Sequence, residues 1–268
     1  MIYPLDLKST DLVLKFTNYI NKTFSKIDYL INNAAQTVRR PLYFYKNLLK
    51  KETHSKLIED SKSNEKKEQN AMILADENLI QKTLNVTESN QIENEDTSEI
   101  YLDHFDEFGE PLDCRENNSW NSTLEELNPI EIMEVQMINN IAPTLLISNL
   151  MKIMSKRNSS NLSDGYSHII NVTSDEGQFQ TFYKSKYHSH TNISKAALNM
   201  LTRTSASLYS QQGILMNSVD PGWISSMIPS FKKPILNCED GASRILNPIL
   251  SNFKEYGKLF KNYKEIEW

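Results

Sequence analysis

Glycine is scarce in this chain, with seven among 268 residues, and its spacing excludes one common ligand-binding turn. No three of these glycines form the Gly-x-Gly-x-x-Gly pattern that lets backbone N–H groups approach a pyrophosphate. The seven are Gly109, Gly165, Gly177, Gly213, Gly222, Gly241 and Gly257. The printed sequence therefore offers no turn of that kind.

Cysteine, metal-ligand patterns and long apolar runs are also missing. Cys114 and Cys238 are too few for a disulfide framework and suit a reducing compartment, so we expect a cytoplasmic protein. No run of eighteen apolar residues exists, and the first six residues are not a signal peptide. The five His and two Cys show no metal-ligand spacing, and Ser174 lies in no Gly-x-Ser-x-Gly elbow. We expect no metal, no membrane segment and no hydrolase of that type.

What is present is enough for a folded core. Hydrophobic residues make up 39% of the chain and charged residues 24%, which is typical of a soluble globular protein. The formal net charge of −5 gives no indication of nucleic-acid binding. We predict one domain over residues 1–268, with a low-complexity polar insertion at 50–99 that buries too little apolar surface to order itself. A partner-binding arm is the alternative interpretation of this insertion.

The stretch 167–200 carries the most informative pattern. Residues 168–173 are rich in β-branched side chains and predict a buried strand that ends at Ser174. A polar loop follows, and helical periodicity begins at Asn192, with Ser189 or Thr191 available as cap. Ligands of open α/β sheets bind at such strand ends, so Ser174 is a candidate site residue.

Apolar periodicity predicts further elements on both sides of this stretch. Helices are expected at 9–24, at 129–157 and from 192 to about 211, with a last one from 239; strands are expected at 27–35, 214–219 and 257–260. Pro143 interrupts the second helix and would leave the carbonyl of Asn139 without its donor. The proline could thus free this carbonyl, or it could simply kink a helix that faces the core.

The order of these motifs resembles the short-chain dehydrogenase/reductase family over residues 5–45 and about 111–268. Members carry a serine after the fifth strand, here Ser174, and a Tyr-x-x-x-Lys helix whose lysine corresponds to Lys195. The resemblance implies an α/β, Rossmann-like doubly wound parallel sheet. Strand 27–35 would be the family's fourth strand, so the fold would lack the first strands, and the chain would be amino-terminally incomplete or a shortened paralogue.

The resemblance also implies a place for NAD or NADP. The family's adenine-contacting pair matches Asp6 and Leu7, and its Asn-Asn-Ala-Gly segment matches Asn33, Ala34 and their neighbours. The family's Pro-Gly turn, where the nicotinamide lies, matches Pro221 and Gly222, although a purely structural turn is an alternative for these two residues. The lysine of the helix would bind the ribose.

The implied catalytic residues are Asn139, Ser174, Thr191 and Lys195, with Asn140 a one-residue alternative to Asn139. Thr191 occupies the position of the family's tyrosine. An aliphatic hydroxyl is far less acidic than a phenol, so it is a poor acid/base group. A displaced group could come from the loop before Thr191, in which the candidates are Tyr183, Tyr187, His188 and His190.

Two segments resemble an uncharacterised subgroup of the family: Asn-Asn-Ala-Ala-Gln-Thr-Val-Arg-Arg-Pro at 32–41 and His-Thr-Asn-x-Ser-Lys at 190–195. In that case the threonine is a subgroup trait. Arg39, Arg40 and Arg115 could bind an anionic ligand or form surface salt bridges.

Two functional hypotheses follow. The first is an NAD(P)-linked oxidoreductase that acts on a small-molecule carbonyl or alcohol, impaired by the missing fingerprint and by Thr191. The second is a non-catalytic binding or scaffold paralogue, a pseudoenzyme.

We expect no nucleic-acid or membrane partner. A fourth strand with an unpaired edge predicts self-association, and a homo-oligomer is possible.

Overall fold

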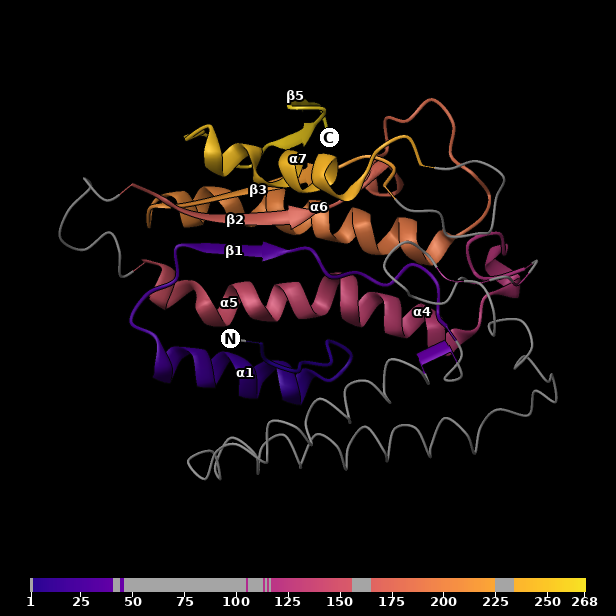
Figure 1. Ribbon diagram of the computed structural model, residues 1–268, viewed down its shortest axis with the longest axis horizontal. Helices are drawn as coiled ribbons and strands as arrows, with labels where there is room; N and C mark the ends of the chain where they lie inside the picture. Colours follow the sequence, from indigo (N-terminus) through magenta and orange to yellow (C-terminus); the bar gives the residue numbers. More distant parts are fainter. Residues whose placement is uncertain are drawn as a thin grey trace. The chain divides into compact units, whose positions relative to one another are not determined.

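The computed structural model describes residues 2–40, 44–45, 105, 113, 115, 117–155, 165–224 and 234–268. The chain divides into two compact units, Met1–Pro4 with Arg40–Glu116 and Leu5–Arg39 with Asn117–Trp268. The second unit contains the sheet and every helix labelled in Figure 1. The predicted insertion at 50–99 lies outside the described residues.

In the first unit, the described side chains gather around one buried carboxylate. Asp113 accepts hydrogen bonds from Arg40 Nη1 at 2.5 Å and from Arg115 Nη2 at 2.7 Å. Burial alone would raise the pKa of Asp113, but the hydrogen bonds and charges of the two guanidinium groups lower it. The Arg40 guanidinium also lies over the ring of Phe44, 5.4 Å from its centre. Both arginines therefore form ion pairs within the protein.

The second unit is built on a five-stranded sheet in the order β1-β2-β3-β4-β5. Strands β1 to β4 are parallel, and β5 pairs with β4 in the antiparallel direction. The strands are β1 (Tyr29–Asn32), β2 (Ser167–Val172), β3 (Ile214–Asp220), β4 (Leu259–Lys261) and β5 (Lys264–Ile266). Every residue of β2 and β3 is buried, as in a parallel sheet that is covered on both faces. The predicted α/β fold with a mainly parallel sheet is confirmed.

Side chains alternate between the two faces of the central strands. Ile169 and Met216 pack in a cluster with α5 and α6 residues, whereas Ile170 and Val219 pack with α7 residues. Helices α5 and α6 therefore cover one face and α7 covers the other (Figure 1). The helices of eight residues or more in the described chain are α1 (Thr10–Thr23), α4 (Pro129–Gln136), α5 (Ala142–Ser155), α6 (Ser189–Ser210) and α7 (Cys238–Leu250).

Most of these helices begin at a side-chain cap. Ser9 Oγ accepts the N–H of Leu12, and Asn128 Oδ1 accepts that of Ile130. Helix α6 differs from the prediction, because it begins at Ser189 and its N-cap residue is His188 in a left-handed conformation, with φ of 46°. Neither Ser189 nor Thr191 is the cap. The cap position comes from a tertiary contact of His188 that no local pattern shows.

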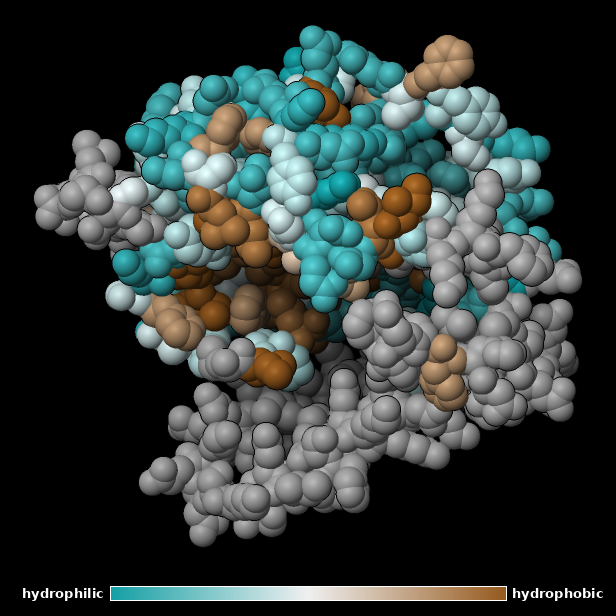
Figure 2. Space-filling view, turned by 45° about the horizontal axis from the view of Figure 1, so that its top comes forward, coloured by the Kyte–Doolittle hydropathy of each residue, from teal (hydrophilic) through white to brown (hydrophobic). Residues whose placement is uncertain are grey.

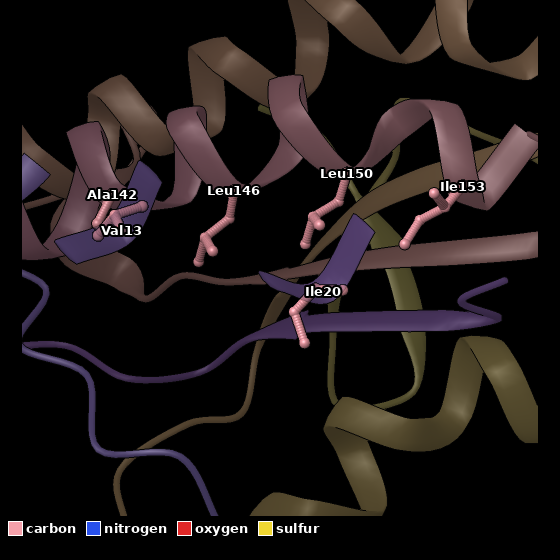
Figure 3. Close-up of a cluster of buried hydrophobic side chains, with 6 residues drawn as sticks. All are labelled: Val13, Ile20, Ala142, Leu146, Leu150 and Ile153. Carbon is pink, nitrogen blue, oxygen red and sulfur yellow. The ribbon is translucent and has the colours of Figure 1, made fainter. Parts of the chain in front are cut away.

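Helix α1 packs on α5. Val13 and Ile20 of α1 meet Leu146, Leu150 and Ile153 of α5 in one buried cluster (Figure 3). Burying a side chain of this size contributes about 1.5–3 kcal/mol, so the cluster fixes the two helices side by side. Leu7 packs against the same cluster. None of the described helices combines the length and apolar character that crossing a bilayer requires.

Apolar side chains also remain at the surface of this unit. Those of α1, its C-cap and β1 that are 37–52% exposed are Leu14, Phe24, Tyr29 and Ile31. Figure 2 shows hydrophobic residues gathered in a hollow on one side of the molecule. Strand β1 pairs only with β2 among the described strands, so it forms an edge of the sheet, as predicted for this strand.

Candidate functional site

The carboxyl ends of three parallel strands bring the candidate residues to one edge of the sheet. Asn32, Val172 and Asp220 are the last residues of β1, β2 and β3. Asn33 and Ala34 follow the first strand and are exposed, and Ser174 follows the second. Because these strands run in the same direction, the residues after them lie at the same edge of the sheet, the edge at which ligands bind in open α/β sheets.

Ser174 lies at the start of a short turn that packs on α6. Its backbone is extended, its side chain is half-buried, and its carbonyl accepts the N–H of Gly177 at 3.1 Å. A Cβ on Gly177 would lie 2.6 Å from the carbonyl carbon of Lys195. Only glycine at position 177 allows the turn to approach the α6 backbone so closely. Asn199 Nδ2 also donates to the Gly177 carbonyl at 3.1 Å. The packing fixes Ser174 close to Lys195.

Lys195 is a buried cation, 7% exposed, on the second turn of α6. Its Nζ donates to the carbonyl of Val172 at 2.9 Å, directly below the end of β2. Burial lowers the pKa of Lys195 to about 8, although the carboxylates of Glu176 and Asp220 act in the opposite direction. An ammonium has three donors, so two remain for a ligand.

Asn139 links the loop after β1 to α6. Its side chain accepts the N–H of Gln36 at 2.8 Å and donates to the Gln36 carbonyl at 2.8 Å and to Ser194 Oγ at 3.1 Å. Asn139 lies in a π-helical turn, Met137–Ile141, between α4 and α5. The N–H of Ala142 donates to the Met137 carbonyl, five residues earlier, so the helix widens just before Pro143. A free Asn139 carbonyl stays a prediction.

The side chain of Thr191 is buried, with 2% of the residue exposed, and its hydroxyl makes no hydrogen bond to the described residues. Ser194 Oγ, which Asn139 contacts, donates to the Thr191 carbonyl at 3.0 Å. The structure thus brings Asn139, Ser174, Thr191 and Lys195 together at the amino-terminal end of α6.

The four alternative acid/base candidates occupy different environments. His188 stacks on Trp120, with ring centres 4.1 Å apart, and its Nδ1 lies 2.8 Å from the Trp120 carbonyl. His190 is fully buried, and its Nε2 lies 3.0 Å from the Thr37 carbonyl. Burial lowers the pKa of His190, which favours the neutral ring. Both histidines therefore hold the start of α6 in place. Tyr183 is 77% exposed, and Tyr187 is half-buried.

Asp220 shapes the turn that follows β3. Its Oδ1 accepts the N–H of Gly222 at 2.9 Å, and Arg244 Nη1 donates to the Pro221 carbonyl at 3.0 Å. Gly222 has φ of +87°, and a Cβ there would lie 2.8 Å from Arg244 Nη1 and from Leu236 Cδ1. Glycine is required at this position by its own backbone. Burial raises the pKa of Asp220, whereas the Gly222 N–H and Lys261 lower it less strongly.

A chain of buried hydrogen bonds crosses the sheet beneath the site. Asn32 Nδ2 donates to Asn171 Oδ1, Asn171 Nδ2 donates to Thr202 Oγ1, and Ser218 Oγ donates to the same hydroxyl, each at 2.8 Å. These side chains satisfy one another where water has no access. They join β1, β2, β3 and α6 into one rigid support.

Asp6 and Leu7, two of the predicted cofactor residues, and Arg39, one of the three predicted anion-binding arginines, make other contacts within the described residues. Asp6 makes local bonds only in the described structure: its Oδ1 accepts the N–H of Lys8 at 2.9 Å, and its carbonyl accepts that of Ser9. Leu7 belongs to the apolar packing of α1. Arg39 Nε pairs with Glu134 Oε2 at 3.3 Å.

Asp220, Gln178 and Lys261 escaped the sequence reasoning. The carboxylate in Asp-Pro-Gly at a strand end was a usable signal for Asp220, whereas no local pattern distinguishes Lys261 from the other lysines of the chain. A separate cavity of about 370 Å³ is lined by α6 and the last residues, including Arg203, Lys258 and Trp268, and it contains none of the site residues. No group of acidic, His or Cys side chains that could hold a metal occurs within the described ranges.

The geometry agrees with a comparison of the sequence with known families. A family model described as short chain dehydrogenase matches residues 47–233, which is more than half of the chain. The chain belongs to the short-chain dehydrogenase family. An uncharacterised protein of Acanthamoeba polyphaga mimivirus is 32% identical over 179 residues, 61% of this chain and 36% of the relative. The chain thus spans about a third of the length of that relative.

Two solved structures share the fold of this short-chain dehydrogenase. The NADPH-bound carbonyl reductase from chicken fatty liver is 18% identical, with a TM-score of 0.56. The match covers 100% of this chain and 77% of the reductase chain. Carbonyl reductase Sniffer of D. melanogaster is 15% identical, with a TM-score of 0.58 and the same coverages. At these identities the likeness shows the fold alone.

Proposed function

We propose that this short-chain dehydrogenase is an NAD(P)-linked oxidoreductase that transfers a hydride between the nicotinamide and a carbonyl or alcohol carbon, and that Thr191 slows the reaction. The observation that carries the proposal is the meeting of Ser174, Lys195 and the Pro221–Gly222 turn at the carboxyl edge of one parallel sheet. The NADPH complex of the chicken carbonyl reductase, which has the same fold, supports it.

The residues present fit the nicotinamide end of such a cofactor. Lys195 Nζ uses one donor on Val172, which leaves two for ribose hydroxyls. Asn33 and Ala34 expose small or polar surface at the end of β1, and Gly222 allows the tight turn that follows β3. No glycine-rich pyrophosphate turn occurs among the seven glycines, so we expect weak binding. When bound, the cofactor supplies or accepts the hydride.

Three polar residues then act on the substrate, the cofactor and a bound water. The half-buried Ser174 hydroxyl donates to the substrate oxygen and polarises the carbonyl. The Lys195 ammonium binds the ribose and favours negative charge beside it. Asn139 holds the loop at Gln36 and the start of α6, so that a water on its main chain could relay protons.

Thr191 is the reason for slow turnover. The reaction needs a group that exchanges a proton with the substrate oxygen near neutral pH, and an aliphatic hydroxyl does so poorly. The Thr191 hydroxyl is buried and has no hydrogen-bond partner among the described residues. This observation favours a second candidate function, in which the protein binds a ligand at the same strand ends without catalysing a reaction.

Cofactor titration distinguishes the two candidates. NADPH and NADH are titrated into the purified chain, with fluorescence or calorimetry as the readout and Lys195→Met as the control. Micromolar binding that Lys195→Met weakens supports the oxidoreductase. No binding at millimolar cofactor leaves the non-catalytic candidate.

A gain-of-function pair then tests the role of Thr191. We expect Thr191→Tyr to raise kcat for carbonyl reduction by roughly 10²-fold or more, because positioned acid/base groups contribute that much. Thr191→Phe has the same bulk without the hydroxyl and is the matched control. Equal rates for the two variants, both verified as folded by circular dichroism, would contradict a missing proton donor as the cause of low activity.

A further inference from the structure

Lys261, the last residue of β4, contacts carboxylates from two different segments of the site. It lies opposite Asp220 in the parallel register of β3 and β4, and its Nζ is 3.2 Å from Asp220 Oδ2. The same Nζ forms a short ion pair with Asp175 Oδ1. One ammonium thus joins the segment after β2 to the segment after β3.

Each of these carboxylates is next to a residue of the proposed site. Asp175 follows Ser174 and begins a short turn. In this turn the N–H of Gly177 donates to the Ser174 carbonyl, and the N–H of Gln178 donates to the Asp175 carbonyl. Asp220 holds the N–H of Gly222 through its other oxygen. Movement of either carboxylate therefore moves the serine or the Pro-Gly turn.

The charges favour this bridge, although the Lys195 ammonium also interacts with the Asp220 carboxylate. Asp220 is 2% exposed, and a buried carboxylate without a cation is strongly unfavourable. Asp175 adds a second negative charge close enough to raise the pKa of Asp220. Without Lys261, the two carboxylates would repel each other across the crevice. Gln178 Nε2, at 3.3 Å from Asp220 Oδ2, would be a neutral and longer link between the segments.

We infer that Lys261 is a positioning residue that holds the Ser174 turn against the Pro221–Gly222 turn and so sets the distance between the substrate-polarising hydroxyl and the nicotinamide side of the crevice. Its effect on catalysis rests on the proposed function. Its effect on the two turns does not, because it follows from the contacts of Lys261 alone.

Hydrogen exchange of the free protein tests the structural part. In Lys261→Met, the amides of Gly177 and Gln178 and that of Gly222 should each lose about tenfold in protection, because both turns open more often. Lys261→Arg should restore most of it. Lys258→Met is the matched control, because Lys258 pairs with Glu255 and Glu265 near the same strand, and should leave these amides unchanged. Loss confined to β4 and β5, or to one turn, would overturn the inference.

A second variant covers the case in which Lys261→Met does not fold. Asp175→Asn changes a side chain that is 54% exposed and should release Gly177 and Gln178 while Gly222 stays protected. Unchanged protection of Gly177 and Gln178 in Asp175→Asn would overturn the inference as well.

Cofactor binding and kinetics test the functional part. If the wild type binds NADPH, Lys261→Met should raise Kd only a few-fold but lower kcat about tenfold or more, with Lys261→Arg restoring kcat, because misplaced groups affect the transition state most. A Kd increase without a kcat change would overturn the positioning role. If the wild type binds no NADPH, the proposed function fails, and the exchange data still decide whether Lys261 joins the turns.

Discussion

Lys195 is a cation buried beside the end of β2, and its protonation is the clearest electrostatic consequence of the site. Burial lowers its pKa to about 8, so the folded protein holds this proton less tightly than the unfolded chain does. Below pH 8 both states carry the charge, and the folded state bears the whole cost of burying it. As the pH rises from about 8 toward the ordinary lysine value, the folded side chain becomes neutral first and the cost disappears.

Lys195→Met should therefore change the pH dependence of stability in a defined direction. Relative to the variant, the wild type should gain about 2 kcal/mol in free energy of unfolding between pH 7.0 and 9.5. Urea denaturation of both proteins at the two pH values measures this. Lys152→Met, at an exposed position of α5, is the control and should follow the wild type. A constant difference between Lys195→Met and wild type would contradict the lowered pKa.

At the scale of single residues, the apolar pattern predicted that Ser174 follows a buried strand, whereas Lys195 and Asn139 were chosen through the resemblance to the family. The roles of all three stay predictions. Sequence reasoning misplaced the cap of α6, because the left-handed conformation of His188 accompanies stacking on Trp120, 68 residues away along the chain. The contacts of Lys261 were also beyond it. An ion pair between β4 and the turn after β2 depends on strand order, which no local pattern gives.

The π-helical turn Met137–Ile141 is the element that connects the loop after β1 to α6. It inserts an extra residue into the helix where Asn139 has to reach both Gln36 and Ser194. Sequence reasoning expected an interruption near Pro143, and the widened turn lies immediately before that proline. Its form depends on what the side chain of Asn139 binds, which lies outside the helix.

Asn139→Ala should destabilise the protein by about 3 kcal/mol. The change removes three hydrogen bonds and leaves the half-buried backbone N–H and C=O of Gln36 without their partner. Asn140→Ala, one residue along the same turn and half-buried, is the control and should cost less than about 1 kcal/mol. Urea denaturation gives both values. Equal costs for the two variants would show that the turn itself, and not the Asn139 bonds, provides the stability.

The β4–β5 hairpin shows the limit of element prediction. The strand near Leu259 was expected because its apolar residues are buried, whereas β5 was missed because Lys264 and Glu265 are exposed. Pairing with β4 creates β5 from a sequence that has little strand character of its own.

At the scale of the molecule, β1 is an edge of the sheet formed by the described strands of the second unit. Tyr29 and Ile31 on this strand are 52% and 37% exposed, and among the described strands β1 pairs with β2 alone. A strand with free N–H and C=O groups and apolar side chains is a template for pairing with another chain. This is the physical basis for the expected self-association.

Tyr29→Lys should reduce that self-association, because charge on an edge strand opposes strand pairing between copies. Sedimentation velocity at micromolar concentration measures the fraction of dimer and larger species, which we expect to fall several-fold. Leu208→Lys replaces another apolar side chain, 58% exposed on α6 away from this edge, and is the control. A monomeric wild type, or an equal effect of both variants, would contradict edge pairing.

The sequence by itself determined the class of fold and the approximate places of the buried strands, because such strands are rich in apolar and β-branched side chains and are followed by polar turn residues. It also determined that a threonine occupies the tyrosine position. Only the tertiary structure decided which charges meet: Lys261 with Asp175 and Asp220, and Lys195 with the Val172 carbonyl. Such pairs join segments distant in the chain, and their energies depend on burial and on distances of a few ångströms, which are properties of the folded molecule.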